Sequence, residues 1–159
     1  MKIFKTLSLA FVVLLAAVAC DKGGDDNNHK KPVDQTGSFE NIEKEWKLVS
    51  VNDAPAEFNV YIGFSTGLFA LYQQMYTLDY QFYEGEYSVD GGTLSGSYFD
   101  AGAWKCEYTG GVSADGNTLT LVSKDANPIT SVYEACTIPE DVKEEATATR
   151  GVVDVTPYL

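Results

Sequence analysis

The stretch Tyr108-Thr109-Gly110-Gly111-Val112-Ser113-Ala114-Asp115-Gly116-Asn117-Thr118-Leu119-Thr120-Leu121 decides the fold. Its Asp-Gly pair is typical of a two-residue β-hairpin loop, and a strand-like segment lies on each side of it. With that loop, Val112 lies opposite Leu119 and Gly110 lies opposite Leu121, so the apolar side chains share one face. The sequence therefore predicts an antiparallel hairpin with one face in a core.

Turn signals of the same kind recur about every 8–12 residues from Ser38 onward. Most segments between them alternate apolar and polar side chains, as half-buried strands do, and none shows a helical period. Strands spaced in this way favour a sandwich or a barrel, and an up-and-down barrel also leaves no exposed edge strand. We predict an all-β domain whose eight antiparallel strands span 45–51, 58–65, 68–74, 80–89, 93–99, 104–112, 117–123 and 130–138.

Large aromatic side chains gather on the face that alternation assigns to the interior. Five of these side chains are predicted to face inward or nearly so: Tyr83, Tyr87, Tyr98, Trp104 and Tyr108. Tyr80 and Phe82 fall out of register with this set, which predicts a bulge or bend near Gly85. The aromatic set is the candidate ligand site: it either lines a pocket at the open end of the barrel or fills a solid core.

The last strand carries an unusual assignment. Val132, Cys136 and Ile138 place Glu134 on the inward face, where it could act as a ligand or reach water at the rim. Tyr133 then points outward, as does Tyr61 on an earlier strand. Exposed Tyr is enriched at protein interfaces, so both are candidate contacts for a partner.

The first nineteen residues are typical of a secretory leader. Lys2 and Lys5 precede the run Leu7–Ala19, which is too short for the roughly 20 apolar residues that span a bilayer. The run ends Ala17-Val18-Ala19-Cys20, which resembles the lipobox of bacterial lipoproteins. That resemblance implies a signal peptide over 1–19, cleavage before Cys20, and acylation of Cys20 as the membrane anchor; the alternative is an ordinary secretory leader.

Residues 20–37 are predicted to form a flexible tether, because the stretch Asp21–Pro32 has no apolar side chain except Pro32. The acidic residues Asp21, Asp25 and Asp26 resemble an export signal of gut bacteria. This resemblance implies an outer-membrane lipoprotein, at the cell surface in preference to the periplasmic side. The remaining residues, 38–159, form the predicted domain with its C-terminal extension.

Several segments of this domain resemble the lipocalin-like, calycin-type domains of small gut-bacterial lipoproteins. The segments are Glu45-Trp46-Lys47-Leu48-Val49-Ser50, Leu94-Ser95-Gly96-Ser97-Tyr98, Gly102-Ala103-Trp104 and Asn117-Thr118-Leu119-Thr120-Leu121. The resemblance implies that Trp46 closes one barrel end and that a basic side chain lies against it. Arg150 is the only Arg, so either Arg150 makes this contact or it is an exposed residue of the tail.

Catalysis is not expected from this chain. The only His, His29, lies in the tether, so no Ser-His-Asp or Cys-His arrangement can form in the domain, and no metal site or cofactor is predicted. The formal charge of -12 excludes nucleic acid as a partner. Cys106 and Cys136 either form a disulfide or remain thiols; the hairpin register places them near opposite ends of the intervening strand, which favours thiols.

After the last strand, Pro139–Ala146 is predicted to form a short helix, since Pro suits its first turn and carboxylates suit its dipole. The apolar residues of the tail can dock on the barrel: Val152, Val153, Val155 and Tyr158. Two functions follow for the predicted monomer. It binds a small apolar or aromatic ligand, or it is a non-enzymatic scaffold with a filled barrel that contacts an envelope or glycan-uptake partner.

Overall fold

Antiparallel strands form one sheet that closes on itself in the computed structural model, which describes residues 38–149 and 156–159. The leader, Cys20, the tether with His29, Arg150 and Val152–Val155 lie outside these residues. Within the described part the strands are β1 (Glu45–Val51), β2 (Ala54–Pro55), β3 (Asn59–Ser65), β4 (Leu68–Gln74), β5 (Gln81–Asp90), β6 (Thr93–Tyr98), β7 (Gly102–Ala103), β8 (Tyr108–Val112), β9 (Thr118–Ser123) and β10 (Thr130–Cys136).

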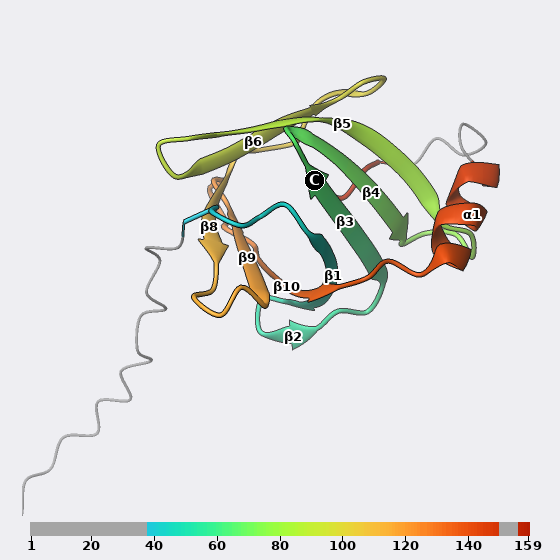
Figure 1. Ribbon diagram of the computed structural model, residues 1–159, viewed down its shortest axis with the longest axis horizontal. Helices are drawn as coiled ribbons and strands as arrows, with labels where there is room; N and C mark the ends of the chain where they lie inside the picture. The colour runs from blue at the N-terminus through green and yellow to red at the C-terminus, as the bar shows by residue number, and fades with distance from the viewer. Residues whose placement is uncertain (1–37, 150–155) are drawn as a thin grey trace, which may run out of the picture. The chain divides into compact units, whose positions relative to one another are not determined.

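The sheet closes because β10 pairs with β9 on one side and with β1 on the other. We call the closed circuit β1-β3-β4-β5-β6-β8-β9-β10 the ring (Figure 1). Its closing pair runs from Glu45 opposite Cys136 to Val51 opposite Ser131, with one irregularity between Leu48 and Ser50. Neighbouring strands in the ring follow one another in the sequence, if the short strands β2 and β7 are left aside. Every pairing in the ring is antiparallel, and every pairing except β1 with β10 joins segments that are close in the sequence.

The hairpin that the sequence analysis started from has the predicted register. Val112 pairs with Leu119 and Gly110 pairs with Leu121, and both leucines are fully buried inside the ring. Gly110 has a φ of 123°, and a Cβ there would lie 2.1 Å from the Thr120 carbonyl oxygen. Only glycine fits this position, so the close approach of β8 to β9 explains the paired glycines of the motif.

The predicted strand 104–112 is wrong over its first half, because only Tyr108–Val112 forms regular strand and Gly102–Ala103 pairs separately with β6. Leu94 pairs with Tyr108, and a regular antiparallel register would then place Gly96 opposite residue 106. Instead, the backbone N–H of Trp104 donates to Gly96, so the segment between Trp104 and Tyr108 holds two residues more than regular pairing allows. The Trp104 indole lies on Gly96, where a Cβ would come within 2.5 Å of the ring. The large side chain thus interrupts the pairing that alternation alone predicts.

One end of the ring, which we call the closed end, is covered by the segment 38–44 that precedes β1 (Figure 1). Ser38 bridges to Val112, and Phe39 and Ile42 are buried in the same core as Trp46. Trp46 is fully buried, and its indole N–H donates to the Ile42 carbonyl oxygen at 2.8 Å. Trp46 therefore occupies the position that the sequence predicted for it, at an end of the ring.

A lysine lies against Trp46. Lys44 Nζ lies 5.9 Å from the centroid of the indole and donates to the Gly116 carbonyl oxygen at 2.7 Å. The sequence analysis considered Arg150 for this contact, and Arg150 lies outside the described residues. Lys44 holds the β8–β9 turn against the segment before β1, since its cation contacts both.

The outside of the ring carries a second apolar face, which the sequence analysis did not expect. Its core consists of Tyr61, Tyr80, Ile138, Val142 and Ala146, with Tyr72, Phe82 and Cys136 packed against it. Val142 and Ala146 belong to the helix α1 (Glu140–Thr149), which lies over β4 and β5. Tyr61 does point outward as predicted, but α1 and its neighbours leave it only 7% exposed, so it is not a free contact surface.

This second face explains the register break predicted at Gly85. Tyr80 and Phe82 point outward to α1, while Gln81 and Gly85 are buried on the inner side, so alternation in β5 is intact. Pairing with β4 continues through Gly85 and pairing with β6 begins at Gly85, with no shift of register in either, so there is no bulge. Glycine is required there because a Cβ would lie 1.9 Å from the Ser97 carbonyl oxygen.

The faces predicted for β10 are reversed. Tyr133 is fully buried inside the ring and Glu134 is exposed, opposite Lys47 of β1. Ile138, which the prediction used as an inward marker, packs outside the ring against α1. Cys106 and Cys136 are both free thiols, as the hairpin register favoured. Among the described residues, no helix has the length and apolar character needed to cross a membrane.

Replacing Trp46 with Ala is expected to lower the free energy of unfolding by about 3–5 kcal/mol, the usual cost of removing a fully buried aromatic ring. Chemical unfolding followed by circular dichroism measures the loss. Lys44→Met is the control, since it leaves the ring packed and removes a cation–π contact worth about 1 kcal/mol. A loss below about 1 kcal/mol for Trp46→Ala would contradict the role of Trp46 in covering the closed end.

Candidate functional site

The end of the ring opposite the closed end, which we call the loop end, includes the β4–β5 and β9–β10 connections. Residues Thr156–Leu159, which we call the inner segment, lie at this end: Leu159 is buried in the core of the ring, Tyr158 packs against that core, and Thr156 is exposed. Leu159 is 1% exposed, and the Tyr158 ring packs 5.6 Å from the ring of Phe58, measured between centroids. Tyr158 packs on the core, as predicted for it, and Leu159 lies inside the ring. The other residues predicted to dock, Val152, Val153 and Val155, lie outside the described residues.

Gln73 of β4 holds the backbone of the inner segment. Its Nε2 donates to the Thr156 carbonyl oxygen at 3.1 Å, and its Oε1 accepts from the Tyr158 N–H at 2.8 Å. These two backbone groups flank Pro157, so one side-chain amide satisfies the groups that a neighbouring strand would pair with. Gln73 is itself fully buried and also donates to Gln81 Oε1 at 3.4 Å.

Two hydroxyl groups complete the contacts with the inner segment. The Tyr98 hydroxyl donates to the Leu159 carbonyl oxygen at 2.9 Å, and the hydroxyls of Ser131 and Tyr158 share a hydrogen bond of 2.8 Å. Tyr98 and Ser131 are 5% and 3% exposed, so these bonds form where water does not compete. The inner segment is therefore bound through both its backbone and its tyrosine side chain.

The predicted aromatic set belongs to the core inside the ring, and among its members Tyr98 bonds directly to the inner segment. Tyr98, Trp104 and Tyr108 are buried, and Tyr83 and Tyr87 pack against the same core from half-buried positions. The Phe69 ring makes edge contacts with Tyr98 at 5.3 Å and with Trp104 at 5.0 Å, which join the inner segment to the Trp104 indole. Edge contacts of this kind fix ring orientation.

Sequence reasoning missed the polar part of the site. The buried polar side chains among the described residues are Gln73, Gln81, Ser123 and Ser131, all uncharged. Gln73 could have been found, because it lies at the same parity as Phe69 and Leu71 in the strand predicted at 68–74. A glutamine at an inward position needs hydrogen-bond partners, which is a signal for a site.

Three buried side-chain groups inside the ring have no hydrogen-bond partner within the described residues: Trp104 Nε1, Gln81 Nε2 and the Tyr133 hydroxyl. The Tyr133 hydroxyl lies beside Ser131, whose hydroxyl is engaged with Tyr158. Leaving a buried donor unpaired costs about 1–3 kcal/mol, so native interiors rarely keep such groups. The inner segment leaves these three groups without a partner.

Burial controls the ionisation of the interior tyrosines. Desolvation raises the pKa of Tyr98, Tyr108 and Tyr133 above the ordinary range, and raises the pKa of Tyr158 as well. On the outer face, burial and the neighbouring Tyr61 raise the pKa of Tyr80 to about 12. The interior phenols therefore stay neutral at physiological pH and act only as hydrogen-bonding groups.

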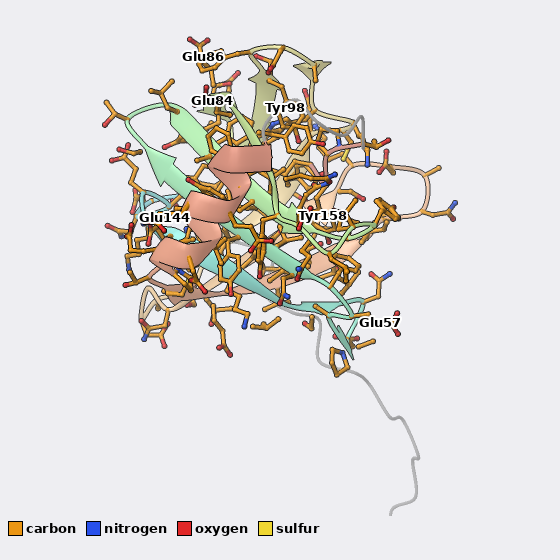
Figure 2. All side chains as sticks on the ribbon, turned by 90° about the vertical axis from the view of Figure 1, so that its right-hand side faces the viewer. Glu57, Glu84, Glu86, Tyr98, Glu144 and Tyr158 are labelled. Carbon is orange, nitrogen blue, oxygen red and sulfur yellow. The ribbon has the colours of Figure 1, made fainter. Side chains whose placement is uncertain are left out.

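The acidic side chains lie away from the interior. Glu84 and Glu86 lie on the outer side of β5, and Glu144 projects from α1 (Figure 2). No cluster of three or more His, Cys, Asp or Glu that could hold a metal occurs in the described part of the chain. The interior has the composition of a neutral binding site: rings, amides and hydroxyls.

Comparison with known proteins adds no assignment to this geometry. No protein-family model, no curated protein and no solved structure matches the chain. The functional argument therefore rests on the interior itself.

Stability is expected to fall as the pH rises above about 10, where the tyrosines of the unfolded chain lose their protons. The pKa of Tyr98, Tyr108 and Tyr133 is raised in the folded state. Their contribution to the free energy of unfolding is therefore complete below pH 10 and declines as the pH rises further. Urea unfolding between pH 8 and 11 measures the decline, and Tyr98→Phe should reduce its slope. A free energy of unfolding that stays constant over this range would contradict the buried, neutral state of these phenols.

Proposed function

We propose that the protein is a lipid-anchored envelope lipoprotein whose ring is a lipocalin-like barrel that binds a small apolar or aromatic ligand in its interior. The observation that carries the proposal is that three buried groups, Trp104 Nε1, Gln81 Nε2 and the Tyr133 hydroxyl, have no partner among the described residues. Trp104 and Tyr133 belong to the aromatic-rich core inside the ring. A core that serves packing alone gains nothing from these groups, whereas a bound ligand with an acceptor would satisfy them.

The position of the closed end supports the anchoring part of the proposal. Ser38, the first described residue, lies at the closed end through its bridge to Val112. A tether over 20–37 that is acylated at Cys20 would join the domain there, while the inner segment enters at the loop end. The described chain therefore begins at the end of the ring opposite the loop end.

The loop end also carries exposed apolar side chains. Tyr76 and Leu78 in the β4–β5 connection are 71% and 89% exposed, and Ile129 before β10 is 45% exposed. Such side chains around an entrance suit the capture of an apolar ligand. They equally suit the second candidate function, a scaffold that contacts an envelope or glycan-uptake partner. The observation that favours the scaffold is that Tyr158 and Leu159 already fill the interior.

Replacing Cys20 with Ser is expected to remove the protein from membranes, because acylation of the thiol supplies the hydrophobic anchor. Fractionation of cells that express the full chain, with a salt wash of the membranes, measures the change. Cys106→Ser is the matched control, since that thiol lies within the domain and should leave partition unchanged. A Cys20→Ser variant that still pellets with membranes would overturn the lipoprotein assignment.

A small aromatic quencher such as 4-nitrotoluene is expected to quench tryptophan emission saturably, because binding in the interior brings it to Trp104. Fluorescence titration of the full chain measures the effect, with correction for absorption by the quencher. Trp104→Phe should abolish the saturable part and leave only Trp46, which is buried at the closed end. Quenching that rises linearly with every probe would favour the filled scaffold.

A further inference from the structure

We propose that the ligand of the interior is a short, neutral, extended peptide that contains a tyrosine, and that the inner segment is a copy of this ligand built into the chain. The proposal rests on the proposed function, since it requires that the interior binds a ligand, and it names the chemical class of that ligand. Four contacts carry it, each between a buried side chain and the inner segment.

The first two contacts recognise peptide backbone. Gln73 binds the Thr156 carbonyl oxygen and the Tyr158 N–H with the two ends of its amide, at 3.1 and 2.8 Å. Only a molecule that presents an acceptor and a donor at the spacing of an extended backbone satisfies both ends. A purely aliphatic ligand would leave Gln73 with only its bond to Gln81, so the two bonds that the inner segment provides would be lost.

The other two contacts set the position along the peptide. The Tyr98 hydroxyl binds the next backbone carbonyl oxygen, that of Leu159, and Ser131 binds the Tyr158 phenol. Phe58 packs on the Tyr158 ring, so the tyrosine is recognised by its face and by its hydroxyl. Together these contacts select a tyrosine followed by an apolar residue.

The interior also selects against charge. The buried polar side chains within the described residues are amides and hydroxyls, with no cation or anion among them. A charged side chain would lose its hydration there without a counter-charge, so a stretch of peptide with uncharged side chains is preferred.

A separate peptide must displace the inner segment, which competes from within the same chain at a high effective concentration. Weakening the inner segment should therefore reveal binding from solution. In the full chain, Tyr158→Ala combined with Leu159→Ala removes the two side chains that pack in the ring, so only the backbone contacts with Gln73 and Tyr98 still hold the segment against an incoming peptide. We expect this double variant to bind acetyl-Thr-Pro-Tyr-Leu-amide with one-to-one stoichiometry in calorimetry, at least about ten-fold more tightly than the unaltered chain.

A matched ligand tests the backbone contact. The same peptide N-methylated at tyrosine lacks the N–H that Gln73 Oε1 accepts, and it should bind the double variant about ten-fold more weakly, the effect of losing a hydrogen bond of about 1.4 kcal/mol. Adding Gln73→Met to the double variant should cause a comparable loss for the unmethylated peptide. Gln74→Met is the control, because Gln74 lies on the outer face of β4 and should change the affinity little.

Circular dichroism shows whether each variant keeps the fold. If the double variant does not, the single variant Leu159→Ala is titrated with the two peptides, and the same order of affinities is required. Equal affinity for the methylated and unmethylated peptides would overturn the proposal. So would a dimer of the double or single variant, seen by light scattering, that dissociates on adding peptide, because the occupant would then be a second copy of the chain.

The quencher 4-nitrotoluene separates failure of this inference from failure of the proposed function. Saturable quenching at Trp104 without binding of either peptide would overturn the peptide inference and leave the ligand-binding function standing. Absence of both would overturn both.

Discussion

Pairing of β1 with β10 is the constraint on which the rest of the structure depends. Within the described residues it is the one strand pairing between distant parts of the chain, and it converts a meander of local hairpins into a ring with no long free edge. The same pair places Glu45 beside the segment that leads from β10 into α1. The Glu45 carboxylate accepts from the Ile138 N–H and lies 3.2 Å from Lys143 Nζ, so the closing strand also positions α1 on the outer face.

Closure also fixes two different apolar surfaces. Inside, the leucines and valines of the strands pack with Trp46 and the inner segment. Outside, Tyr61, Tyr72 and Phe82 lie in one row across β3, β4 and β5, because the register places them opposite one another. A row of rings on the outside of a sheet must be covered, and α1 covers it with Val142 and Ala146. The sequence of α1 is mainly polar, which suits a helix that buries one narrow stripe.

Local signals in the sequence were enough to predict the strands. The Asp115-Gly116 hairpin has the predicted register, and most strand limits differ from prediction by a residue or two, since alternation and turn residues are local properties. The faces of β5 and β10 were harder to predict. In each strand, residues of one parity face the inner apolar surface and residues of the other parity face the outer one. Phe82 and Ile138 belong to the outer surface. Alternation alone does not say which of two apolar faces is the interior, so Tyr133 and Glu134 were exchanged.

The aromatic half of the candidate site could also be predicted from local signals. Tyr98, Trp104 and Tyr108 are large, and large rings at inward parity are visible in a sequence. The polar half could not be predicted, because Gln73 and Tyr158 are 85 residues apart in the sequence and only the closed ring brings them together. The role of the buried Gln73 depends on the backbone groups that it binds, and these belong to residues that follow α1 in the chain.

The chemistry of the interior follows from what fills it. A ring of this kind could bury apolar side chains alone, and every amide placed inside requires a partner. Gln73 and Gln81 lie opposite each other on β4 and β5, and they satisfy only part of each other's capacity. The backbone of the inner segment supplies the missing partners of Gln73, whereas one donor of Gln81 stays free. The polar groups and the segment that binds them thus depend on each other: without the segment, Gln73 would keep only its bond to Gln81 and would lose both of its backbone partners.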